Sequence, residues 1–144
     1  MELITVVMVM GTLVRMSVPN LHDLLLKARA TEVAGYFQTV RLAAMSYHAD
    51  HHRWPDDGYA GLVPTDLAPY LPQGFSFQQQ GYRLDWESWA LPDGLPGDAP
   101  IRGLVGISVV TGDRELGQAV QDLLGHAMAH YTLDDTYTFV VERE

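Results

Sequence analysis

The chain has 144 residues, of which 47% are hydrophobic and 19% are charged, which is the composition of a folded protein with one modest core. It contains no cysteine, so disulfides and thiolate metal sites are excluded. Residues 1–53 hold five basic and four acidic residues, a net charge of +1. Residues 54–144 hold four basic and fourteen acidic residues, a net charge of −10. This negative charge disfavours nucleic-acid binding by residues 54–144.

The first predicted element is an apolar helix over residues 2–18. Glu2 precedes an uncharged run over residues 3–14, and Arg15 ends that run. A helix that spans a bilayer alone needs about 20 apolar residues, so this run is too short. We therefore expect the segment either to be buried by other helices or to belong to a longer precursor.

A second helical segment is predicted over residues 20–52. Pro19 lacks a backbone donor and crowds the preceding turn, so we expect it to kink or locally unwind the helix. Apolar residues then recur at three- and four-residue spacing and form one stripe: Val33, Tyr36, Phe37, Val40, Ala44 and Tyr47. Together the two segments predict a rod of about 75 Å, which must project from a domain of this size.

The order of Glu2, apolar run, Gly11, Val18, Pro19 and amphipathic helix resembles the N-terminal segment of type IV pilins and type II secretion pseudopilins. The resemblance covers residues 1 to about 55, and Arg15 departs from it because the family has a small or apolar residue there. It implies a filament subunit, not an enzyme, in which Glu2 pairs with the N-terminal amine of an adjacent subunit. Gly11 and Pro19 complete the pattern of assembly residues.

The same resemblance implies a location and a set of partners. The N-terminal helix would anchor the chain in the bacterial inner membrane, and would later pack against identical or homologous subunits in a periplasmic or extracellular filament. Assembly-platform proteins are the other expected partners, and nucleic acid is not expected.

Residues 54–144 predict an acidic α/β head. A loop over residues 59–80 contains a short helical turn near residues 66–71, and strands follow at residues 82–91, 104–110 and 136–141. Asp113 is the predicted N-cap of one additional helix over residues 114–130. The expected fold is α+β: a long N-terminal helix, with an apolar first half (1–19) and an amphipathic second half (20–53), packs on the small, mainly antiparallel sheet of the head (54–144). Four alternating residues of the first strand should share one face of the sheet: Tyr82, Leu84, Trp86 and Ser88.

A histidine cluster at the end of the long helix supports an alternative function. His48 with His51 or His52 has the i, i+3 or i+4 spacing that two imidazoles need to bind one zinc ion, and Asp56 or Asp57 offers a third ligand. The alternative is therefore a membrane-anchored metal-binding module or hydrolase. The competing interpretation is structural, because histidines at a helix C-terminus interact favourably with the helix dipole.

Two further metal hypotheses concern the head. His126 and His130 are spaced i, i+4 on the predicted helix over residues 114–130, with Asp122 one turn earlier, but the glutamate that metalloproteases place between such histidines is absent. Some major pseudopilins bind calcium in a loop of the head, although no twelve-residue calcium-loop pattern is present here. The loop acids concerned are Asp93, Asp98, Asp134 and Asp135. We expect no cofactor, and we expect Trp54, Trp86 and Trp89 to be core or junction residues.

Overall fold

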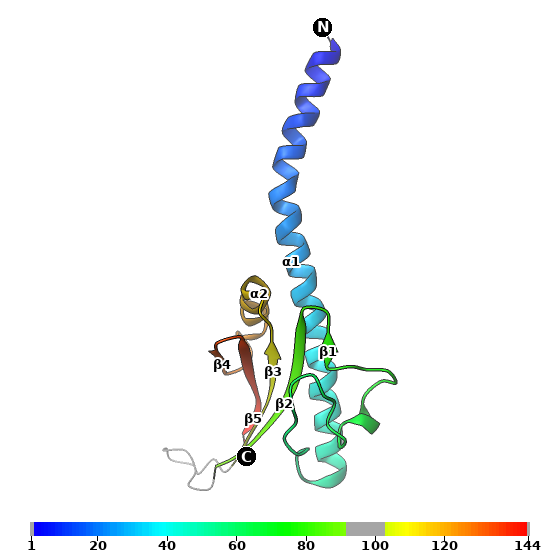
Figure 1. The fold of residues 1–144 in the computed structure, drawn as a ribbon, viewed down its shortest axis with the longest axis vertical. Helices are drawn as coiled ribbons and strands as arrows, with labels where there is room; N and C mark the ends of the chain where they lie inside the picture. Colours follow the sequence, from blue (N-terminus) through cyan, green and yellow to red (C-terminus); the bar gives the residue numbers. More distant parts are fainter. Residues whose placement is uncertain (1, 92–102, 144) are drawn as a thin grey trace.

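The computed structural model describes the backbone of residues 2–91 and 103–143, and the side chains of residues 21–91 and 103–143. Its longest element is the helix α1 (Glu2–His51), which at 50 residues is about 75 Å long. Figure 1 shows the C-terminal half of α1 beside the head and the N-terminal half extending away from it. The long projecting helix predicted from the sequence is therefore present.

α1 continues through Pro19 without interruption, so the prediction of local unwinding at this residue is wrong. Proline removes one backbone hydrogen bond, but a helix of this length keeps the bonds of the turns on both sides. The two predicted segments, 2–18 and 20–52, are thus one helix that ends at His51.

The head contains a five-stranded sheet in the order β1-β2-β3-β5-β4, and every neighbouring pair is antiparallel. The strands are β1 (Gln78–Gln79), β2 (Tyr82–Ala90), β3 (Gly103–Val110), β4 (His130–Leu133) and β5 (Thr136–Arg143). β2, β3 and β5 were predicted, whereas β1 and β4 were not. The fold is α+β, as predicted.

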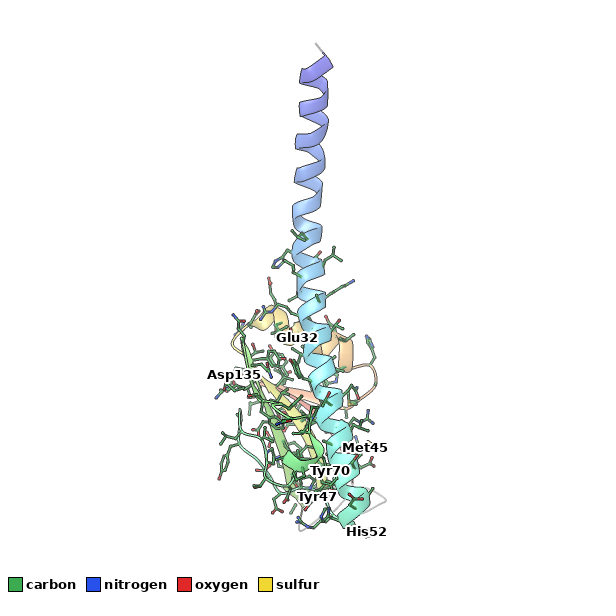
Figure 2. All side chains as sticks on the ribbon, turned by 90° about the vertical axis from the view of Figure 1, so that its right-hand side faces the viewer. Glu32, Met45, Tyr47, His52, Tyr70 and Asp135 are labelled. Carbon is green, nitrogen blue, oxygen red and sulfur yellow. The ribbon has the colours of Figure 1, made fainter. Side chains whose placement is uncertain are left out.

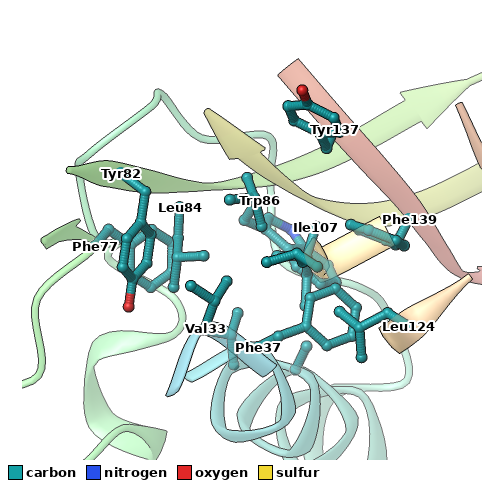
Figure 3. Packing of buried hydrophobic residues seen from close by; sticks show 14 of the residues in the cluster. Val33, Phe37, Phe77, Tyr82, Leu84, Trp86, Ile107, Leu124, Tyr137 and Phe139 are labelled. Carbon is teal, nitrogen blue, oxygen red and sulfur yellow. The ribbon is translucent and has the colours of Figure 1, made fainter. Parts of the chain in front are cut away.

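One face of the sheet packs on α1 (Figure 3). Trp86 on β2 is paired with Ile107 on β3, which is paired with Phe139 on β5, and these three side chains are fully buried. Phe37 of α1 meets Phe139 edge to face, with ring centroids 5.6 Å apart. The α1 residues of this core are Ala30, Val33, Phe37, Val40, Ala43 and Ala44. The predicted packing of the second half of the long helix against the sheet is confirmed.

The second helix, α2 (Arg114–Leu124), begins where the sequence predicts it. The side chain of Asp113 accepts a hydrogen bond from the backbone N–H of Leu116, which is the geometry of an N-cap. The helix ends at Leu124, however, and not at residue 130. Gly125 closes it, and the chain then turns into β4, whose backbone groups pair with β5. The predicted C-terminal part of this helix is wrong.

The segment between α1 and β2 closes the end of the core. It contains the short 3₁₀ helix η1 (Ala68–Tyr70), inside the predicted helical turn. The backbone N–H groups of Gly58 and Gly61 donate to the carbonyl oxygens of Trp86 and Leu84, each at 2.9 Å, so this segment covers part of the edge of β2.

The tryptophans hold the junction between the helix and the sheet. Trp86 is fully buried and its Nε1–H donates to the carbonyl oxygen of Pro55 at 3.1 Å. Trp54 packs against Trp86, with ring centroids 6.3 Å apart, and Trp89 is half-buried. Tyr82, Leu84 and Trp86 face the core as predicted, and Ser88 is half-buried. The prediction of a core or junction position is confirmed for Trp54 and Trp86, whereas Trp89 lies outside the core cluster.

Candidate functional site

The three residues expected to direct assembly lie along α1 and not around one pocket. Glu2 is the first residue of the helix, Gly11 follows about 14 Å along the axis and Pro19 a further 12 Å or so. The segment that contains them, residues 2–19, is blue in Figure 1 and extends beyond the head. In the part of the chain that the structure describes, no helix is both long and apolar enough to cross a membrane.

The face of α1 that points away from the sheet is exposed and uncharged along the head. We call it the outer face, and its residues are Gly35, Gln38, Leu42, Met45 and Ala49. The side chains of Leu42 and Met45 remain 66% and 48% exposed, whereas Phe37 and Val40 on the opposite side are fully buried. Met45 and the buried Tyr47 are both labelled on α1 in Figure 2. Large exposed apolar side chains on a helix face typically mark an interaction surface.

A second exposed apolar group lies where α1 leaves the head. Leu21, Leu24 and Leu25 are 55%, 62% and 57% exposed, respectively. Two contacts attach this part of α1 to the start of α2: His22 Nε2 lies 3.0 Å from a carboxylate oxygen of Glu115, and Arg29 donates to the N-cap Asp113 at 3.2 Å. All four side chains are substantially exposed, so these contacts position the two helices more than they stabilise them.

The histidine cluster at the end of α1 is divided among different partners. The ring of His48 stacks on Trp54 at 4.3 Å between centroids, and that of His51 stacks on Tyr47 at 4.2 Å. His52 has a φ of 56°, and its backbone N–H donates to the carbonyl oxygen of His48 at 2.8 Å, which closes the helix. These contacts give each histidine a place in the helix end.

Among the side chains that the structure describes, those of residues 21–91 and 103–143, no three histidines, aspartates or glutamates are grouped as a metal site. The structure also contradicts the expected placement of His126 and His130 on one helix, because His126 lies in a turn after α2 and His130 begins β4. Asp134 and Asp135 form the turn between β4 and β5. Asp93 and Asp98 lie outside the described residues.

A cluster of carboxyl groups lies on the sheet face that points away from α1. Asp85 and Glu87 alternate with the core residues of β2, and the Asp57 carboxylate accepts from the backbone N–H of Ser88 at 2.8 Å. Glu87 accepts a hydrogen bond from the buried hydroxyl of Ser108 at 3.1 Å. In the part of the chain that the structure describes, the buried Oδ1 of Asp85 has no hydrogen-bond partner.

Burial raises the pKa of Asp85 from 3.8 to about 7, and the neighbouring charges of Glu87 and Asp57 add to the rise. Burial also raises the pKa of Glu87, although the hydrogen bond from Ser108 opposes this change. Since the pKa of Asp85 is higher in the folded chain, its ionisation destabilises the fold. The protonated Asp85 therefore contributes its full stability to the fold below about pH 4. This contribution is lost as the pH rises toward 7.

We accordingly expect Asp85→Asn to stabilise the chain at pH 8 and to have little effect at pH 4. After allowance for solvent screening of a half-exposed group, the gain at pH 8 should be on the order of 1–2 kcal/mol. Chemical denaturation at the two pH values measures it, with Asp134→Asn at an exposed turn as the matched control. Equal effects of Asp85→Asn at both pH values would contradict the assignment of the shift to Asp85.

Comparison with protein-family models gives no match for this chain, and comparisons with curated proteins and with solved structures give none either. The function therefore has to be argued from the residues and the geometry.

Sequence reasoning missed the outer face of α1 and the carboxyl cluster. Leu42, Met45 and Ala49 do carry a signal, because they recur at three- and four-residue spacing on the side of the helix opposite the predicted stripe. The carboxyl cluster had no such signal, since Asp57 and Asp85 are distant in sequence and meet only because the segment after α1 pairs with β2.

Proposed function

We propose that this protein is a structural subunit of a type IV pilus-like or type II secretion pseudopilus filament. The observation that carries the proposal is the shape of the chain: α1 extends far beyond the head, and its projecting part begins with Glu2 and an uncharged run. A free apolar helix of this kind needs cover from lipid or from other subunits.

Glu2 gives the free half of α1 a means of setting its position among its neighbours. A carboxylate inside an apolar helix bundle is costly unless a cation pairs with it. The N-terminal amine of an adjacent subunit is the cation that the family resemblance implies. Such a pair forms at one axial offset between subunits, so it would favour one register.

The exposed apolar side chains on α1 support helix packing beyond this first contact. In the proposal the first half of α1 is the apolar anchor, and the second half is amphipathic, with one face on the sheet and the outer face toward other subunits. Gly11 would allow close approach of neighbouring helices, and Pro19 would provide a place where α1 bends during assembly.

The head would face outward from the filament. Residues 54–144 carry a net charge of −10, which keeps such a surface solvated and disfavours contact with nucleic acid. Before assembly the subunit would reside in the bacterial inner membrane with its platform proteins, and afterwards in a periplasmic or extracellular filament. The partners are then other copies of this chain or homologous subunits, and no enzymatic activity is proposed.

The test is Glu2→Ala in cells that produce the full chain, with filaments counted by negative-stain electron microscopy. Breaking a buried ion pair costs about 3–5 kcal/mol, so we expect filament yield to fall by more than tenfold. Glu32→Ala, the same change at an exposed position of the same helix, is the matched control and should leave the yield unchanged. Normal filament number and helical parameters with Glu2→Ala would refute this role for Glu2.

A further inference from the structure

A groove of about 600 Å³ lies between α1 and α2 at the level where α1 leaves the head, and it is open to solvent. Its apolar lining comes from Leu26 and Ala30 of α1 and from Ala119 and Leu123 of α2. Leu123 is 48% exposed at this groove.

The groove also carries an excess of negative charge. Two carboxylates, Asp23 and Asp122, and one ammonium group, that of Lys27, belong to its lining. The Asp122 carboxylate accepts a hydrogen bond from Gln118 at 3.1 Å. Among the side chains described, Asp23 takes part in none of the ion pairs. The groove therefore suits an apolar partner that brings one positive charge.

The N-terminal half of α1 has this chemistry. Arg15 is the only lysine or arginine among residues 2–26, and apolar residues surround it. The nearest acids on the same helix are Asp23 and Glu2, about 12 and 20 Å away along the axis, which is too far for a direct ion pair within one straight helix. An arginine in an apolar helix that is to be buried needs an anionic partner.

We infer that the groove between α1 and α2 receives the N-terminal helix of a second copy of this chain, with Arg15 of that copy paired with Asp23. This inference rests on the proposed filament function and specifies one of its contacts. Two parallel copies of α1 offset by about 12 Å bring Arg15 level with Asp23. Asp122 adds to the negative potential around the arginine.

Charge reversal tests the pair in the full chain. Arg15→Glu and Asp23→Lys are each expected to lower filament yield at least tenfold, because each places two like charges side by side. The double variant, which restores opposite charges in exchanged positions, should recover most of the yield. No recovery in the double variant, or recovery when Arg15→Glu is combined with Glu115→Lys instead, would overturn the assignment to Asp23.

Cross-linking supplies a second measurement that does not depend on yield. Because the chain has no cysteine, a disulfide between Val14→Cys in one copy and Leu123→Cys in another reports only their mutual contact. Co-expression of the two single variants is expected to give a covalent dimer that neither variant forms when expressed alone, whereas Val14→Cys with Thr132→Cys, on the edge strand β4, is expected to give none. Filaments without the first dimer would refute the groove contact and leave the filament function standing. Absence of filaments from the unchanged protein would refute the function itself.

Discussion

Replacing both Leu42 and Met45 by lysine is expected to abolish filament assembly while leaving the isolated subunit folded. The two side chains are 66% and 48% exposed on the outer face of α1, so lysine at either position remains in water in the free subunit. Exposed substitutions of this kind change the free energy of unfolding by about 0.5 kcal/mol or less. In a filament, by contrast, two unpaired ammonium groups would be buried against neighbouring helices, at a cost of several kcal/mol each.

The matched control places the same two charges elsewhere on the surface. Gln80→Lys with Thr132→Lys changes the net charge equally at exposed positions of the head, before β2 and on the edge strand β4. Filament yield by electron microscopy and unfolding by chemical denaturation should then separate the two effects. Normal filaments from the Leu42→Lys, Met45→Lys variant would show that the outer face is not buried on assembly. Loss of filaments in the control as well would attribute the effect to net charge.

The sequence predicted correctly those elements whose spacing of apolar residues matches the face that the folded chain buries. The three- and four-residue spacing of Val33, Phe37, Val40 and Ala44 identified the buried face of α1, and all four are buried against the sheet. The alternation from Tyr82 onward identified β2 in the same way. Such positions are predictable because the spacing of apolar residues in the sequence matches the repeat of the helix or strand that carries them.

The errors occurred where distant residues decide the outcome. β1 is only two glutamines long and exists because Gln78 and Gln79 pair with Arg83 and Tyr82 across a turn. The sequence predicted a helix as far as residue 130, but Gly125 ends α2 and β4 gains backbone pairing with β5 instead. At Pro19 the prediction failed in the other direction. Proline locally disfavours a continuous helix, but α1 continues on both sides of this residue and keeps it in the helix.

The candidate assembly surface was predictable only in part. Glu2, Gly11 and Pro19 follow one another on a single helix, so their order in the sequence is also their order in space. Which face of α1 remains uncovered could be known only once the sheet was placed, and the groove beside Asp23 requires α2 to pack next to α1.

Replacing Phe37 by alanine is expected to have the largest effect on the stability of the subunit. Phe37 is fully buried and contacts Phe139 across the interface between α1 and the sheet. Truncating a buried phenylalanine loses its transfer free energy and leaves a cavity, at a total cost of about 3–5 kcal/mol. Since a domain of this size is stable by about 5–15 kcal/mol, a large share of that stability would be lost.

Chemical denaturation of the full chain in a mild detergent measures this loss, with the fluorescence of the buried Trp86 as the signal. Leu42→Ala is the matched control, because it truncates a large side chain on the exposed side of the same helix and should cost about 0.5 kcal/mol or less. The two alanine variants thus compare the two faces of α1: one face holds the head to the helix, and the other is free for neighbouring subunits. Similar losses of stability for Phe37→Ala and Leu42→Ala would contradict this division of α1 into a buried face and an outer face.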